Sequence, residues 1–170
     1  MIFQECDWQE VAAEGMVTLR TMGGLFLVTQ GKGGYPNVMT IGWLTTGIVW
    51  GRPVAVVLVR PSRYSHTLLE ETPYFSVNVP VETMQRELDL CGRCSGRDTD
   101  KFTQCGFTSL SIEGMPIPVI QECRAFLVCE VIQKTRVEPT AFSSPVLAEF
   151  YPQDDFHSVY FGVIKRAGRK

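Results

Sequence analysis

Short apolar runs that end at glycine, proline or asparagine constrain the fold of this chain more than any other feature of its sequence. The runs are rich in valine, isoleucine, phenylalanine and threonine, which favour β-strands. One of them, residues 53–60, is almost entirely aliphatic, which is typical of a strand buried on both faces. The expected strands are 24–30, 38–50 with a break near Gly42 or Gly47, 53–60, 75–79, 119–120, 125–137, 146–150 and 158–164.

Three short helices are expected between these strands. They are 62–71 with Ser62 as N-cap, 82–90 followed by Gly92, and a short helix between Asp98 and Gly106. A chain of 170 residues has the size of one domain. The pattern therefore predicts a single, mainly β domain over 1–170, with its strands in a small barrel.

Composition and charge exclude several classes of protein. Sixteen basic and eighteen acidic residues leave a formal net charge of −2, so we expect no nucleic-acid partner. The longest aliphatic run, 54–59, is far shorter than the roughly 20 residues of a membrane span, so no membrane association is expected. The first residues lack the basic-then-apolar order of a signal peptide. We therefore expect a cytoplasmic protein whose six cysteines are reduced.

Several familiar catalytic patterns are absent from the sequence. The glycine-rich segment 31–34 is followed by Pro36, which prevents the helix that a dinucleotide fingerprint requires. There is no Gly-x-Ser-x-Gly elbow, and two histidines, His66 and His157, are too few for a three-histidine metal site. His66 is interpreted as an ordinary, satisfied histidine.

Three cysteines lie close together in the sequence. Cys91 and Cys94 form a Cys-x-x-Cys pair, and Cys105 follows eleven residues later. The closeness of Cys91 and Cys94 is either adventitious or marks a redox-active pair. A zinc site is the least favoured alternative, because it would need a fourth ligand.

Cations and hydroxyl groups gather at two loop-to-helix junctions. Residues 60–65 join the aliphatic strand to the first expected helix, and residues 95–102 precede the third. The start of a helix carries unpaired N–H groups and a partial positive charge. Together the two junctions would hold a phosphate dianion. The alternative is that the arginines are solvated and the serines only cap their helices.

These segments, in their order along the chain, resemble the flavin reductase-like, flavoredoxin family. The resemblance covers about residues 20–165 and is carried by the motifs 37–43, 60–65, 75–80, 91–92 and 95–102 and by the closing strand 157–163. It implies an FMN-binding split β-barrel that is usually homodimeric. The aliphatic segment 53–59 would suit burial at the subunit interface.

The resemblance also implies where FMN would bind. The strand 39–42 would run beside the isoalloxazine, while residues 60–65 would surround the ribityl phosphate and Lys101 would add a charge. Residues 78–80 and 94–96 would line the remaining wall. The implied cofactor-binding residues are Met39, Thr40, Ile41, Gly42, Arg60, Pro61, Ser62, Arg63, Tyr64, Ser65, Asn78, Val79, Pro80, Cys94, Ser95, Gly96 and Lys101. No metal ligand and no catalytic side chain is expected, because the redox chemistry belongs to the flavin.

Two functions share this pocket. The first is an NAD(P)H-dependent reductase that passes electrons to free flavin, a ferric complex or another acceptor. The second is a flavoredoxin-type electron-transfer protein that a redox protein reduces. A third, less favoured class is a thiol or metal-binding module built on Cys91, Cys94 and Cys105.

Overall fold

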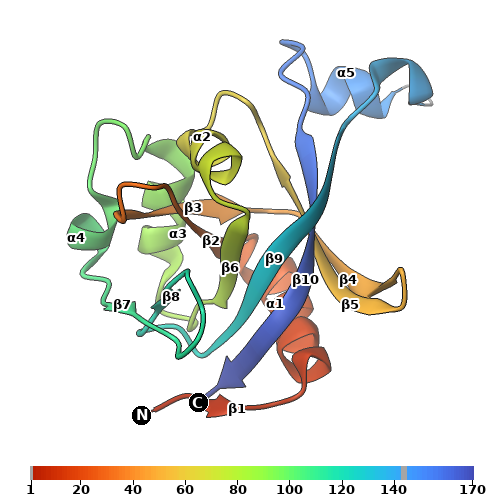
Figure 1. Ribbon diagram of the computed structural model, residues 1–170. Helices are drawn as coiled ribbons and strands as arrows, with labels where there is room; N and C mark the ends of the chain where they lie inside the picture. Colours follow the sequence, from red (N-terminus) through yellow and green to blue (C-terminus); the bar gives the residue numbers. More distant parts are fainter. Residues whose placement is uncertain (1, 143–144) are drawn as a thin grey trace.

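The computed structural model describes residues 2–142 and 145–170, and its centre is one antiparallel sheet. Seven strands follow one another in the order β3-β2-β6-β9-β10-β5-β4, and β1 pairs with the end of β10 (Figure 1). The strands of this sheet are β1 (Gln4–Glu5), β2 (Leu25–Gln30), β3 (Pro36–Ile41), β4 (Leu44–Val49), β5 (Arg52–Val59), β6 (Tyr74–Val79), β9 (Ala125–Arg136) and β10 (Ser158–Arg169). The prediction of a mainly β fold is confirmed.

The barrel is open between its two end strands. β3 and β4 are joined by Gly42 and Trp43 but stand at opposite ends of the strand order. Of the two positions at which the sequence predicts a break, Gly42 is therefore confirmed and marks the split in the barrel, whereas Gly47 lies inside β4 (Leu44–Val49). A separate pair of short strands, β7 (Ser109–Leu110) and β8 (Val119–Ile120), lies outside this sheet.

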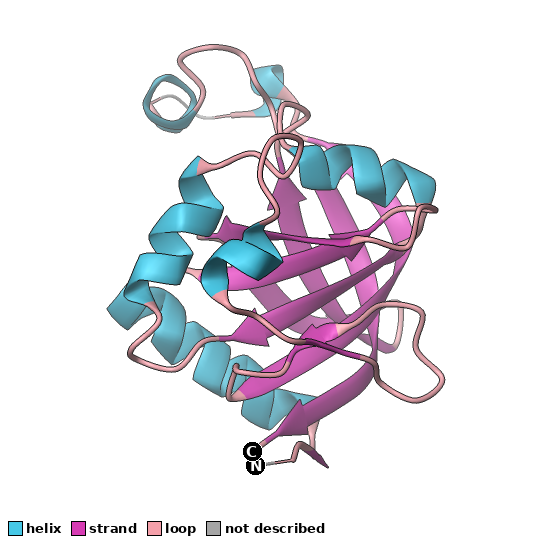
Figure 2. Ribbon diagram, turned by 90° about the vertical axis from the view of Figure 1, so that its left-hand side faces the viewer, coloured by secondary structure: helices cyan, strands magenta, loops and turns pink. Residues whose placement is uncertain are grey.

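Each face of the sheet packs against a hydrophobic core. The inner core includes Leu27, Val57, Val77, Leu127 and Tyr160. On the other face, Phe26, Val28 and Phe126 pack with side chains from helices beside β3. Those helices are α3 (Gln85–Arg93) and α4 (Lys101–Cys105), which lie on one side of the sheet in Figure 2. The helix α2 (Tyr64–Glu71) instead packs against the inner core through Leu69.

The three predicted helices are present, with shifted starts. α2 has Arg63 rather than Ser62 as its N-cap, and α4 is capped by Asp100 rather than Asp98. α3 runs three residues beyond the predicted end, through Gly92, because the Cys94 N–H donates to the Leu90 carbonyl and continues the helical ladder.

The helix α1 (Trp8–Met22) was not predicted from the sequence. Asp7 caps its start by accepting a hydrogen bond from the Gln9 N–H, and Gly23 ends it in a left-handed conformation. Its buried face is formed by Val11, Gly15 and Thr18. Two of these three residues are not apolar side chains, so the hydrophobic periodicity that indicates a helix is weak.

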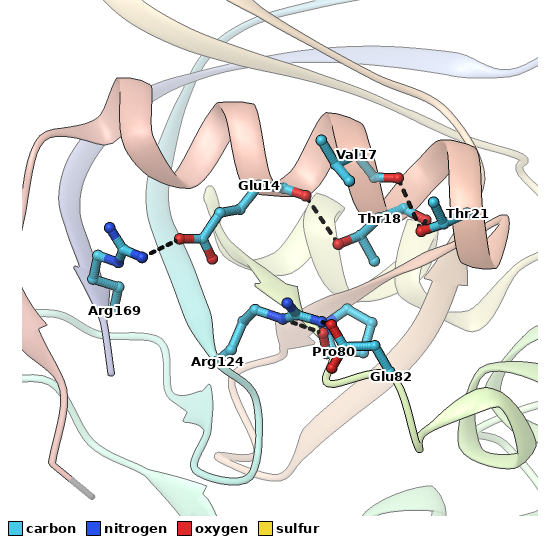
Figure 3. Close-up of polar contacts among 8 residues, drawn as sticks. All are labelled: Glu14, Val17, Thr18, Thr21, Pro80, Glu82, Arg124 and Arg169. Carbon is cyan, nitrogen blue, oxygen red and sulfur yellow. Dashed lines mark hydrogen bonds and ion pairs between the residues drawn. The ribbon is translucent and has the colours of Figure 1, made fainter.

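An ion pair joins α1 to the end of β10, as Figure 3 shows. Glu14 forms a 2.7 Å ion pair with Arg169 of β10, and Thr18 donates to the Glu14 carbonyl. Near the same helix, Arg124 donates to the Pro80 carbonyl at 2.8 Å and pairs with Glu82. The segment that follows β6 is therefore anchored near α1.

The prediction of a strand at 146–150 is wrong, because these residues form the helix α5 (Val146–Phe150). Leucine, alanine and glutamate inside this segment are good helix formers, and Pro145 stands at its N-cap. A short 3-10 helix (Pro139–Ala141) precedes it, and both lie between β9 and β10, at the ends that project beyond the sheet (Figure 1). No helix in the described part of the chain is long and apolar enough to cross a membrane.

Candidate functional site

Three neighbouring cavities follow the open edge of β3. The first cavity, about 220 Å³, is lined by Met39, Thr40, Ile41, Gly42, Trp43, Leu58, Arg60, Arg63, Gly92 and His157. The second, about 240 Å³, is lined by Asn37, Met39, Ser62, Arg63, Tyr64, Ser65, Arg93, Cys94, Ser95, Gly96 and Lys101. The third, about 510 Å³, lies beyond Asn37 and Gly96 and includes Tyr35, Arg97 and Asp100.

The first two cavities are adjacent parts of one candidate site. Met39 and Arg63 line both of them. Neither cavity alone reaches the range of about 300–1,000 Å³ that is usual for small-molecule sites, but the two together fall within it. Because β3 ends the strand order, one edge of its backbone is left with unpaired N–H and C=O groups. A ligand that spans the two cavities would run along this edge.

The second cavity carries buried positive charge. The side chain of Lys101 is only 4% exposed, and its Nζ donates to the Cys94 carbonyl at 3.3 Å. Burial lowers the pKa of Lys101 from 10.5 to about 8. Arg63 donates to the carbonyls of Gly92 and Cys91 at 2.9 and 3.3 Å, and burial lowers the pKa of its guanidinium as well.

Both cations contact the C-terminal end of α3, which offers only a partial negative charge of about half a unit. Among the described residues, neither Arg63 nor Lys101 forms an ion pair with a carboxylate. Buried charges are normally paired, because leaving them unpaired costs several kcal/mol. The second cavity is therefore suited to an anion.

The two helix starts differ in what they offer an anion. α2 begins at Tyr64 without a side-chain cap. The His66 N–H donates to the Arg63 carbonyl at 3.0 Å, while the N–H groups of Tyr64 and Ser65 have no recorded acceptor among the described residues. At α4, the Asp100 carboxylate already accepts from the Thr103 N–H at 3.1 Å. The second junction thus contributes the ammonium of Lys101 rather than a vacant helix start.

Glycine is required where the two junctions meet. A Cβ on Gly96 would overlap the carboxamide of Asn37, whose Nδ2 donates to Ser65 Oγ at 2.9 Å. Arg97 stacks over the Tyr64 ring at 5.2 Å and donates to the Ser62 carbonyl. These contacts hold residues 62–65 and 95–97 against each other, so the two predicted junctions do converge on one cavity.

Arg60 lies apart from the second cavity, where the other predicted phosphate-binding side chains gather. Its guanidinium donates to the carbonyls of Asp155 and Phe150 at 2.8 and 2.7 Å and lies over the Tyr151 ring. Ser62 Oγ donates to the Asp155 carboxylate at 2.6 Å. Arg60 lines the first cavity and not the second. It therefore ties the segment before β10 to the mouth of the site.

Aromatic side chains close one side of the first cavity. Trp43 packs against the rings of Phe150 and His157 at 5.4 and 4.9 Å. His157 Nδ1 and the Tyr151 hydroxyl form a 2.8 Å hydrogen bond. Burial, together with the nearby charge of Arg60, lowers the pKa of His157 to about 4, so its imidazole is neutral at pH 7.

Four predicted site residues lie outside the first two cavities. Pro61 lies in the turn between β5 and α2 and lines neither cavity. Asn78 is fully buried on the sheet face opposite the inner core, where its Oδ1 accepts from the Ile120 N–H. Val79 is also buried, and the Pro80 carbonyl accepts from Arg124 near α1. The structure therefore does not bring 78–80 to the site.

The other predicted residues line one or both cavities, and six further residues join them. The added residues are Asn37, Trp43, Leu58, Gly92, Arg93 and His157. Asn37 and Trp43 stand within the motif 37–43, so the motif itself was a signal for them. His157 stands in the closing strand 157–163, which also carries the resemblance, but its proximity to Trp43 arises from the fold.

The cysteines do not form a metal site. Within residues 2–142 and 145–170, no three histidine, cysteine, aspartate or glutamate side chains are placed to hold a metal ion. Cys91 contacts Cys105, with 3.7 Å between their sulfur atoms, and Cys94 lines the second cavity. The thiol or metal-binding module thus lacks a ligand cluster in the described part of the chain.

Comparison with known proteins places the chain in a family. Residues 18–161 match the family model of the flavin reductase like domain. An uncharacterized protein of Pyrococcus abyssi is 31% identical over 133 residues, which cover 77% of this chain and 75% of that protein. An uncharacterized protein of Archaeoglobus fulgidus is 29% identical over 113 residues, 66% of this chain and 63% of the relative. The match thus spans less than two thirds of the latter protein.

Solved structures share the fold. The flavoredoxin of Methanosarcina acetivorans is similar with a TM-score of 0.68 and 27% identity, covering 88% of this chain and 69% of that one. An FMN-binding domain of a flavin reductases-like enzyme from Shewanella baltica has a TM-score of 0.69 at 20% sequence identity. The match covers 99% of this chain and 77% of that one. The fold is a split barrel, as the sequence predicts.

Proposed function

Since the chain belongs to the flavin reductase-like domain family, we propose that it is an oxidoreductase that binds FMN in the first two cavities and is reduced by NAD(P)H. The proposed acceptor is free flavin, a ferric complex or another small oxidant. The observation that carries the proposal is the pair of cations in the second cavity, the buried Lys101 and the half-buried Arg63, which lack a carboxylate partner among the described residues.

The residues present fit FMN in charge and in shape. A phosphate monoester would receive charge-assisted hydrogen bonds from Arg63 and Lys101 and N–H groups from the start of α2. Ser65 and Ser95 add hydroxyl donors to the same wall. In the first cavity, a planar ring would have the edge of β3 on one side and aromatic side chains on the other. FMN, when bound, supplies the hydride and electron chemistry.

The protein's own residues would position the ring and control its access to water. In this proposal, backbone groups of Thr40 and Ile41 hold the polar edge of the ring. Trp43 and His157 exclude water from one side of the first cavity, and Arg60 keeps the segment that carries His157 in place. A neutral His157 adds no charge at pH 7, so the positive charge lining the first cavity comes from Arg60 and Arg63.

Titration with FMN followed by reduction tests the proposal. Apo-protein should bind FMN in a one-to-one ratio, and anaerobic NADPH or NADH should bleach the visible flavin absorption of the complex. Binding without bleaching by either nicotinamide would refute the reductase. Absence of FMN binding would refute the whole proposal.

A second function, electron transfer between proteins, is favoured by the likeness to a flavoredoxin at 27% identity. It uses the same cofactor site but takes electrons from a redox protein. Reduction of the FMN complex by a reduced ferredoxin, with no reduction by NADPH or NADH, would select this function.

We also propose that the protein is a homodimer formed through the outer face of β5 and β10. The inner side of β5 packs in the core through Ala55, Val57 and Val59, while Leu58 on its outer side is half-buried and lines the first cavity. Trp50, in the β4–β5 turn, is 61% exposed and lies 5.5 Å from the Phe161 ring.

A second copy on this face would cover exposed apolar surface and border the first cavity. Sedimentation should show a dimer in the wild type and a monomer in Trp50→Asp. Aspartate tolerates the positive φ of 51° at this position, so the turn should keep its shape. A monomeric wild type would refute the dimer.

A further inference from the structure

Two cysteines outside the proposed flavin site lie in contact. Cys91 is in the last turn of α3 and fully buried, and Cys105 is the last residue of α4 and partly exposed. Their Sγ atoms are 3.7 Å apart. We propose that this pair is a redox-modification site, at which a disulfide joins α3 to α4 when the protein meets an oxidising low-molecular-weight disulfide.

The contact differs from the one that the sequence motif indicates. Cys91 and Cys94 form the Cys-x-x-Cys pair, but the sulfur contact recorded among the described residues joins Cys91 to Cys105. Cys94 lies beyond the end of α3, where its carbonyl accepts from Lys101. Cys123 and Cys129 are fully buried, so a soluble oxidant does not reach them in the folded protein.

Exposure sets the order of the reaction. Cys105 is the accessible thiol, so its thiolate attacks the small disulfide first and expels one thiolate. Cys91 then loses its proton and attacks the Cys105 sulfur, which expels the second thiolate. Two protein thiols are oxidised to one disulfide, and one small disulfide is reduced to two thiols. Burial raises the pKa of both Cys91 and Cys105, so the exchange is slow at neutral pH and requires sustained oxidising conditions.

The bond would close the segment 91–105 into a covalent loop. This segment contains Ser95, Gly96 and Lys101, which line the second cavity. A closed loop of this length restricts the unfolded chain and also limits opening of the segment in the folded state. Formation of the bond does not depend on the proposed function. Any effect on flavin binding rests on that proposal and is left out of the test.

The experiment uses purified apo-protein equilibrated with glutathione buffers of increasing oxidised fraction. Free thiols are counted, and peptide mapping identifies the linked residues. In oxidising buffer the count should fall by two of the six thiols, the mass should fall by two hydrogen atoms, and the map should join Cys91 to Cys105. The melting temperature should rise by roughly 5–10 °C. Hydrogen exchange of residues 94–100 should slow.

Matched variants separate this pair from the sequence motif. Cys105→Ser, at a partly exposed position, should keep all its remaining thiols, whereas Cys94→Ser should still form the bond. A link between Cys91 and Cys94, an unchanged wild-type thiol count in the most oxidising buffer, or loss of the bond in Cys94→Ser would each overturn the proposal. The wild-type peptide map decides the question even if a variant fails to fold.

Discussion

Replacing Lys101 by methionine should make the apo-protein more stable and its FMN complex weaker. The side chain is 4% exposed, and its Nζ has one recorded acceptor, the Cys94 carbonyl. Burial lowers the pKa of Lys101 from 10.5 to about 8. At about 1.4 kcal/mol per tenfold change in proton affinity, this difference corresponds to a cost of about 3 kcal/mol for keeping the ammonium charged in the fold.

Methionine has a similar length and carries no charge, so the variant avoids most of that cost. The free energy of unfolding of the apo-protein should rise by about 2–3 kcal/mol at pH 7, which raises the melting temperature by roughly 4–10 °C. The same change removes a charge-assisted contact to the phosphate. FMN should therefore bind about 10- to 100-fold more weakly, a loss of roughly 1.5–3 kcal/mol.

Thermal unfolding of apo-protein and fluorescence titration with FMN measure the two effects. Lys165→Met is the matched control, because Lys165 lies on the surface in an ion pair with Glu130. The control should change neither the melting temperature nor the FMN affinity appreciably. If Lys101→Met instead destabilises the apo-protein and binds FMN as tightly as the wild type, the ammonium belongs to the structure and not to a cofactor site.

Three further predictions follow from the geometry of the site. Between about pH 8 and 10.5, folded Lys101 binds fewer protons than unfolded Lys101, so its contribution should make the stability of the apo-protein rise with pH. The affinity for FMN should fall above about pH 8, because the ammonium loses its charge. Unfolding and FMN titration across this pH range measure both trends, and Lys101→Met should lack them. Gly96→Ala should lower the affinity for FMN and destabilise the protein by about 1–3 kcal/mol, because the new Cβ overlaps the Asn37 side chain. Denaturant unfolding measures the loss of stability, and wild-type stability would contradict the close approach of Gly96 to Asn37. Arg60→Gln should make residues 150–155 more susceptible to limited proteolysis, and it should weaken FMN binding less than Arg63→Gln does. If Arg60→Gln weakened FMN binding more, the phosphate would lie in the first cavity.

Local signals predicted most of the strands and located the two junctions, while the resemblance to the family predicted that the junctions share one site. The strand breaks at Gly42 and at the turn after Gln30 depend on glycine and proline, whose backbone preferences act within a few residues. The aliphatic residues of β5 mark a strand regardless of its neighbours. Helix starts were less predictable, because Asp98 and Asp100 are both good N-caps and packing selects the second.

Features that depend on contacts distant in sequence could not be predicted. Asn78 resembles a binding residue in its motif, but the pairing of β6 with β2 and β9 turns its side chain toward the buried Ile120 N–H. Arg60 and Arg63 are equivalent cations in the sequence. The segment before β10 engages Arg60 and the end of α3 engages Arg63, so only the fold distinguishes them.

The affinity of the wild-type protein for FMN relative to riboflavin tests the central claim most directly, because the two ligands differ only in the phosphate. Two cations, the buried Lys101 and the half-buried Arg63, each contributing a charge-assisted hydrogen bond, predict that FMN binds at least about 100-fold more tightly. Equal affinities for FMN and riboflavin would contradict the assignment of Arg63 and Lys101 to a phosphate group.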